Sequence, residues 1–110
     1  MEFMEILEIT SAQNPKLKEV VQLLEKSKLR RERGLFVVEG LREIRACIRN
    51  GYQLRSLFYN SDILSSRQIE DLLTTSVPAA VGAGSGNASY GRGVAVFSLS
   101  AQAYSKIAYR

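Results

Sequence analysis

The side chains that could do chemistry in this sequence are mainly cations, and they are concentrated in its first third. Residues 16–33 carry seven basic and three acidic residues, and the run from Lys26 to Arg33 has five bases and one acid in eight positions. Such a cluster attracts a polyanion, because each cation can neutralise a phosphate. A solvated helix end, whose cations suit the negative end of the helix dipole, explains the same run equally well.

Three further cations fall on one stripe of a helix that we expect over residues 41–50. Arg42, Arg45 and Arg49 follow the spacing i, i+3, i+7, so they project from neighbouring positions of the helix surface. A nucleic acid suits these cations better than a membrane, because no strongly amphipathic anchor accompanies them. The candidate contacts to a polyanion are therefore Lys16, Lys18, Lys28, Arg30, Arg31, Arg33, Arg42, Arg45 and Arg49.

Groups for catalysis or metal binding are scarce. The sequence has no histidine and one cysteine, Cys47, which excludes Ser-His and Cys-His catalytic pairs, zinc sites with several Cys or His ligands, and an internal disulfide. We expect Cys47 to be a small core residue. Glu39 could serve as a general acid or base, but an acidic residue there more often caps or salt-bridges the next helix. We assign no catalytic, cofactor-binding or metal-binding residue in this chain.

A glycine-rich stretch over residues 82–93 invites comparison with nucleotide-binding loops. The dinucleotide fingerprint G-x-G-x-x-G would need glycine where the sequence has Asn87 or Ser89. The Gly-Lys-Ser/Thr of a phosphate-binding loop is also missing from the sequence. The composition instead predicts a flexible loop.

Aromatic side chains can also contact nucleic acid, by stacking on unpaired bases. Phe36 and Phe58 lie in expected strands and are predicted to be core residues, whereas Tyr52, Tyr90 and Tyr104 remain candidates for stacking. By composition and spacing, the chain shows no active site.

The hydrophobic pattern predicts alternating helices and strands. Asn14-Pro15 begins a helix that should run to about Lys28, with apolar residues at i, i+3, i+4 and i+7. We expect a buried strand over residues 35–38, a helix over 41–50 and a second strand over 54–59.

The second half of the chain continues this alternation. Ser65 and Gln68 match a capping box for a third helix, residues 77–81 fit a short edge strand, and residues 94–99 fit another strand. Ser100 should cap a last helix. Strands that alternate with helices predict an α/β fold, in which helices cover both faces of one layered sheet.

The bulk composition agrees with one folded domain. The 110 residues suffice for a single core, and a hydrophobic fraction of 45% and a charged fraction of 24% are ordinary for a soluble protein. The sequence has no run of eighteen apolar residues for a membrane-spanning helix, and its acidic first five residues do not fit a signal peptide. We therefore expect a single domain over residues 1–110 and a cytoplasmic location.

Two motifs carry a resemblance to a known family. Residues 9–18 read Ile-Thr-Ser-Ala-Gln-Asn-Pro-Lys-Leu-Lys, and residues 28–40 read Lys-Leu-Arg-Arg-Glu-Arg-Gly-Leu-Phe-Val-Val-Glu-Gly. In this order and at this separation they resemble the opening signatures of SpoU (TrmH-type) RNA 2'-O-ribose methyltransferases. The resemblance covers residues 9–76 and is thin beyond them, where the glycine-rich stretch departs from the compact family pattern.

The resemblance implies a domain that binds the RNA substrate, rRNA or tRNA, and that has an α/β/α sandwich fold similar to that of ribosomal protein L30e. In such enzymes a second, knotted domain binds S-adenosylmethionine (AdoMet) and supplies the catalytic residues, and no part of this sequence matches it. The chain alone is therefore expected to hold no cofactor and to be inactive. Family members commonly form homodimers, mainly through the second domain, so a monomer is expected for this chain by itself.

Two alternatives remain open at this stage. The chain could be a stand-alone RNA-binding module of the L30e type without a catalytic partner, and composition alone does not separate that module from an enzyme's substrate arm. It could also be a protein-interaction module whose basic run docks an acidic partner. The last helix reaches Arg110 without a capping glycine or a closing strand, and we therefore expect a further domain to follow.

Overall fold

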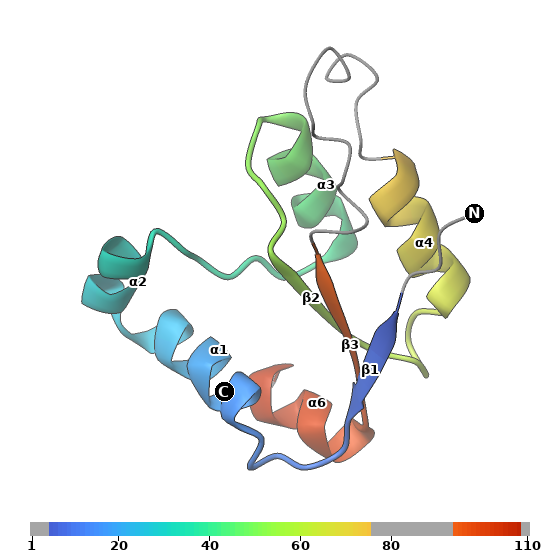
Figure 1. Ribbon diagram of the computed structural model, residues 1–110, viewed down its shortest axis with the longest axis horizontal. Helices are drawn as coiled ribbons and strands as arrows, with labels where there is room; N and C mark the ends of the chain where they lie inside the picture. The colour runs from blue at the N-terminus through green and yellow to red at the C-terminus, as the bar shows by residue number, and fades with distance from the viewer. Residues whose placement is uncertain (1–4, 76–93, 109–110) are drawn as a thin grey trace.

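The computed structural model describes residues 5–75 and 94–108, and these form a three-stranded parallel sheet with helices packed on it. The strands are β1 (Ile6–Ile9), β2 (Ser56–Asn60) and β3 (Ala95–Leu99), in the spatial order β1-β3-β2. The last strand of the chain is therefore the central one (Figure 1). Val96 lies beside Ile6 of β1 on one side and beside Leu57 of β2 on the other.

Helices cover both faces of this sheet. On one face lie α3 (Leu41–Arg49) and α4 (Ser66–Thr75), and on the other lie α1 (Pro15–Glu25) and α6 (Ala101–Ala108), as Figure 1 shows. The short helix α2 (Ser27–Arg33) follows α1 directly and lies at the end of this second layer. The predicted α/β fold, a three-layer α/β/α sandwich, is confirmed.

The alternation of side chains along β3 divides the interior into two cores. Val94 and Val96 pack toward α4, together with Leu57 and the fully buried Ile69 and Leu72. On the other face lies a second cluster, formed by Phe97, Leu99, Ile9, Leu17 and Ala103. Because successive side chains of a strand point to opposite faces, one five-residue strand anchors both helical layers.

Local sequence sets the starts of three helices as predicted. Asn14 caps α1 by accepting a hydrogen bond from the Lys16 N–H at 2.9 Å, and Pro15 occupies the first turn. Ser65 and Gln68 exchange the hydrogen bonds of a capping box before α4. Ser100 accepts from the Ala103 N–H and so caps α6.

The helix predicted from Asn14 to Lys28 is in fact two helices. Lys26 has an extended backbone (φ −118°, ψ 104°), which ends α1 at Glu25 and starts α2 at the next residue. The sequence pattern missed this break because no proline or glycine marks it. Gly34, at φ +68°, then ends α2 in the left-handed conformation that glycine adopts most readily.

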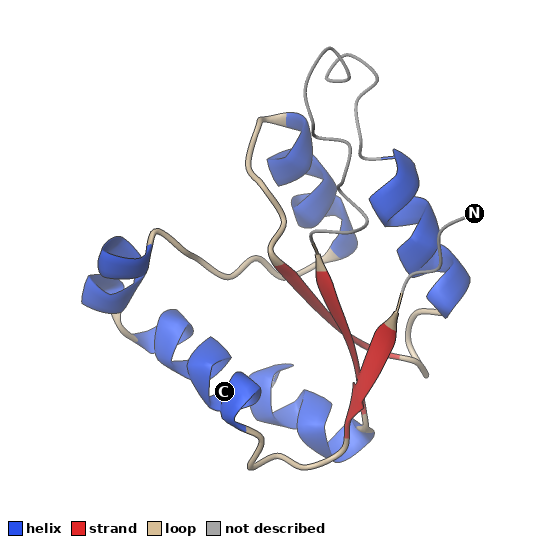
Figure 2. Cartoon of the chain, in the orientation of Figure 1, coloured by secondary structure: helices blue, strands red, loops and turns tan. Residues whose placement is uncertain are grey.

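The strand predicted over residues 35–38 is wrong, as is the burial predicted for Phe36. These residues form the extended link from α2 to α3, drawn as loop in Figure 2, and the Phe36 side chain is 50% exposed. A strand needs a neighbour with open hydrogen-bonding groups. Residues 35–38 form no ladder with β1, β2 or β3, so their β-branched and aromatic composition alone does not make them a strand. The strand β1 was not predicted from the sequence.

The remaining predicted elements agree with the structure wherever it describes them. The helix over 41–50 is α3, the strand over 54–59 is β2 shifted by one or two residues, and the strand over 94–99 is β3. The predicted strand at 77–81 and the predicted flexible loop at 82–93 lie outside the described residues.

A buried side chain joins the carboxyl ends of β2 and β3 and provides a test of this arrangement. The Asn60 Nδ2 atom donates to the Leu99 carbonyl at 2.8 Å, and its Oδ1 atom accepts from the Asp62 N–H at 3.0 Å. Asn60→Ala should lower the free energy of unfolding by about 1–3 kcal/mol, because it leaves buried polar groups without partners.

Urea unfolding followed by circular dichroism measures this change. The matched control is Asn50→Ala, which removes an exposed side-chain bond to the Ala46 carbonyl and should cost about 0.5 kcal/mol or less. Equal losses in the two variants would contradict the role assigned to Asn60.

Candidate nucleic-acid interface

The cations predicted to contact a polyanion lie in two groups on different layers of the sandwich. Six lie on α1 and α2, and the other three lie on α3 across the molecule (Figure 1). The first group consists of Lys16, Lys18, Lys28, Arg30, Arg31 and Arg33. The second consists of Arg42, Arg45 and Arg49, all exposed. The structure therefore does not bring all nine residues together on one helix face.

Two arginines of the first group are used inside the molecule. The Arg30 guanidinium donates to the Leu23 and Leu24 carbonyls at 2.6 and 3.1 Å, so it satisfies the last turn of α1. The Arg33 guanidinium pairs with the Glu19 carboxylate at 2.5 Å. Both contacts bind α2 back onto α1, and they explain why the chain bends at Lys26.

Lys16 also has an intramolecular contact. Its Nζ atom lies 5.4 Å from the centre of the Phe97 ring, a cation–π arrangement at the edge of the second core. The side chain can still reach solvent, since Lys16 is exposed. Through this contact Lys16 helps to pack α1 against β3 of the sheet.

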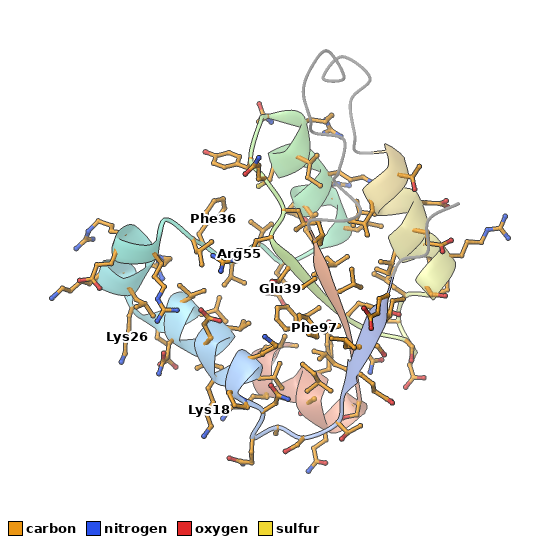
Figure 3. The ribbon with its side chains drawn as sticks, in the orientation of Figure 1. Lys18, Lys26, Phe36, Glu39, Arg55 and Phe97 are labelled. Carbon is orange, nitrogen blue, oxygen red and sulfur yellow. The ribbon has the colours of Figure 1, made fainter. Side chains whose placement is uncertain are left out.

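The cations best placed for an external partner are Lys18, Lys28 and Arg31. All three are exposed, and Lys28 makes only a long contact of 4.0 Å with Glu32, itself largely in solvent. Such surface pairs contribute little, so this lysine is readily available to a phosphate. Lys26, which was not among the predicted contacts, is exposed at the junction of α1 and α2. Figure 3 shows Lys26 and Lys18 pointing outward.

A cleft separates the two basic groups. It has a volume of about 1100 Å³ and is bounded by α1, by the link over residues 34–40, by β2 and by α6. Its lining is mostly apolar, with Arg33, Arg55, Glu19 and Glu39 as its charged members. The sequence did not indicate Arg55 as a site residue, because nothing in its spacing distinguishes it from an ordinary surface arginine.

The residues considered for catalysis do not form a catalytic arrangement. Glu39 is exposed on the cleft and neither caps nor salt-bridges α3 among the described residues, which corrects the structural role expected for it. Gly40 is the cap of α3 instead, at φ +103°. Cys47 is half-buried and also lines the cleft.

No group of three or more His, Cys, Asp or Glu side chains within the described part of the chain could hold a metal ion. No helix of residues 5–75 and 94–108 is long and apolar enough to cross a membrane.

The family model described as "MRM3-like substrate binding domain" matches residues 14–110, which is nearly the whole chain. The chain belongs to this family. The match covers the basic helices, the cleft and the sheet from β2 onward, so the MRM3-like domain and the described fold coincide from α1 to α6. The match supports the substrate-binding domain predicted from the two motifs. Comparisons with curated proteins and with solved structures found no match.

The contrast between Arg30 and Arg31 allows a structural role to be separated from a binding role. Arg30→Ala should destabilise the MRM3-like domain by about 1–2 kcal/mol, because the carbonyls at the end of α1 lose a charged donor. Arg31→Ala should change stability by no more than about 0.5 kcal/mol, since its side chain is exposed. Urea unfolding of both variants measures the difference, and an equal loss in the two would refute the role given to Arg30.

Proposed function

We propose that this chain is the domain that binds and positions RNA in a SpoU-type RNA 2'-O-ribose methyltransferase. The observation that carries the proposal is the match of residues 14–110 to a family of substrate-binding domains. The two opening motifs and the exposed cations on α1 and α2 support it further. Phosphates held by these cations would supply affinity, and the shape of the folded RNA would supply selectivity.

The chemistry of methyl transfer is assigned to another part of the parent protein. A ribose 2'-hydroxyl must lie in line with the sulfonium of AdoMet, and we assign no residue of this chain to hold that donor. The family that the chain matches is described as a substrate-binding domain and not as a methyl-transferring one. We therefore expect the chain alone to transfer no methyl group. The parent enzyme is proposed to be a homodimer in the cytoplasm, as the resemblance and the composition imply.

Salt dependence of RNA binding tests the proposed surface. With about four phosphates neutralised, the slope of log affinity against log salt should be about −3. Arg31→Gln should make the slope shallower by about 0.7–0.9, and the double variant Lys28→Gln/Arg31→Gln by about twice that amount. Fluorescence anisotropy with a labelled structured RNA measures both values.

Lys28 and Arg31 suit this test because their replacement leaves the contacts between α1 and α2 intact. The matched control is Arg67→Gln on α4, which removes the same charge from an exposed position on another layer. A slope that changes equally in Arg67→Gln would mean that only net charge matters and that α2 is not the contact surface.

A stand-alone RNA-binding module is the competing proposal, and the length of the parent reading frame decides between the two. A further stretch of about 150 residues, the size of one typical domain, with a glycine-rich knot would support the methyltransferase. A stop codon just after Arg110 would leave a small RNA-binding protein. Binding to an acidic protein, with no binding to RNA, would instead support an interaction module.

A further inference from the structure

Two aromatic rings stand together in solvent beside the cleft. Phe36 is 50% exposed and Tyr52 is 54% exposed, and their ring centres are 5.2 Å apart with an angle of 81° between the rings. Aromatic side chains of this size are usually buried, and an exposed apolar patch on a soluble domain commonly marks a contact site. An edge-to-face pair also holds each ring in a defined orientation.

The ends of two helices fix the positions of these rings. The Tyr52 N–H donates to the Cys47 carbonyl at 3.0 Å, which ties the residue to the end of α3. The Leu35 N–H donates to the Arg30 carbonyl at 3.2 Å, which ties the residue before Phe36 to the end of α2. The pair is therefore presented by ordered backbone on both sides.

Each ring also follows a helix whose last turn is basic. Arg31 lies in the last turn of α2, five positions before Phe36, and Arg49 lies in the last turn of α3, three positions before Tyr52. Among the described residues, neither arginine makes a hydrogen bond or an ion pair. Both helices that lead to the rings therefore end in a turn that carries an exposed arginine.

The cleft that the pair lines also has charged members of both signs, among them Arg55 and Glu39. Phe36, Tyr52, Arg55 and Glu39 all line it. Figure 3 shows Phe36, Arg55 and Glu39 one after another. A carboxylate in this place disfavours a phosphate, but it can accept hydrogen bonds from the amino groups of a nucleobase. The arrangement fits a base in the cleft and phosphates outside it.

We propose that Phe36 and Tyr52 form a stacking site for one unpaired nucleobase of the RNA substrate. The base enters the cleft beside Arg55 and Glu39, and Arg31 and Arg49 bind the phosphates on either side of it. A base inside a duplex is already stacked on its neighbours, so the site selects single-stranded loops or bulges. This inference rests on the proposed RNA-binding function and names the form of RNA that the domain takes.

A single tryptophan placed at the site reports on stacking directly. The chain has no tryptophan, so Phe36→Trp introduces one fluorescent indole. A hairpin RNA with an unpaired loop should quench this fluorescence, and a blunt duplex with the same stem should not. The control is Leu7→Trp, at a position equally exposed on the opposite edge strand β1, where neither RNA should quench.

Affinity provides the second readout. Phe36→Leu keeps an apolar side chain but removes the ring, and it should weaken binding of the hairpin by about 5- to 150-fold while leaving duplex binding unchanged. Phe36→Tyr should restore the hairpin affinity. Circular dichroism of each variant checks that it is folded, and the quenching experiment stands by itself if Phe36→Leu is unstable.

The outcomes separate this inference from the function on which it rests. Anisotropy with the unsubstituted chain first establishes whether RNA binds at all, and absence of binding to any RNA would overturn both. Binding without quenching at position 36, or equal quenching by hairpin and duplex, would overturn the stacking site alone. Loop-dependent quenching together with the loss in Phe36→Leu would support it.

Discussion

All three layers of this domain are attached to one strand, β3, whose backbone is paired on both sides and whose side chains enter both cores. Val96 and Phe97 are neighbours in the chain, yet they anchor opposite helical layers. Because β3 comes from residues 95–99, near the end of the chain, the sheet cannot close until most of the chain has been brought together. The positions of α1 and α3, and of the cations on them, therefore follow from contacts that are distant in sequence.

The basic run of the first third serves two purposes that its composition does not distinguish. Arg30 and Arg33 join α2 to α1 through carbonyl and carboxylate groups, and this leaves Lys18, Lys28 and Arg31 directed to solvent. Cations that satisfy a helix end cannot at the same time be fully available to a phosphate. Fewer cations of the run are accordingly available to a polyanion than its composition suggests. Arg30 and Arg33 hold the helix that carries the available ones in place.

Unlike the basic run, the link between α2 and α3 is mainly apolar, and yet it lies outside the sheet. Its ring at Phe36 meets Tyr52 at the edge of a cleft, between two helix ends that carry arginines. Exposed aromatic rings and exposed arginines thus occur on the same two segments. The RNA-binding role proposed for this domain uses both kinds of side chain, because phosphates provide affinity and exposed bases provide selectivity.

Much of this domain follows from local sequence, because caps and periodic apolar positions act over a few residues. Asn14, Ser65 and Ser100 set the starts of α1, α4 and α6, and the alternation of strands and helices determined the α/β class. The two motifs predicted a substrate-binding domain, which the family match supports. Only the tertiary structure decided that β1 rather than residues 35–38 pairs with β3, that the first helix breaks at Lys26, and that Phe36 reaches solvent. These outcomes depend on contacts between segments that are separated in the sequence, and such contacts leave no local pattern in it.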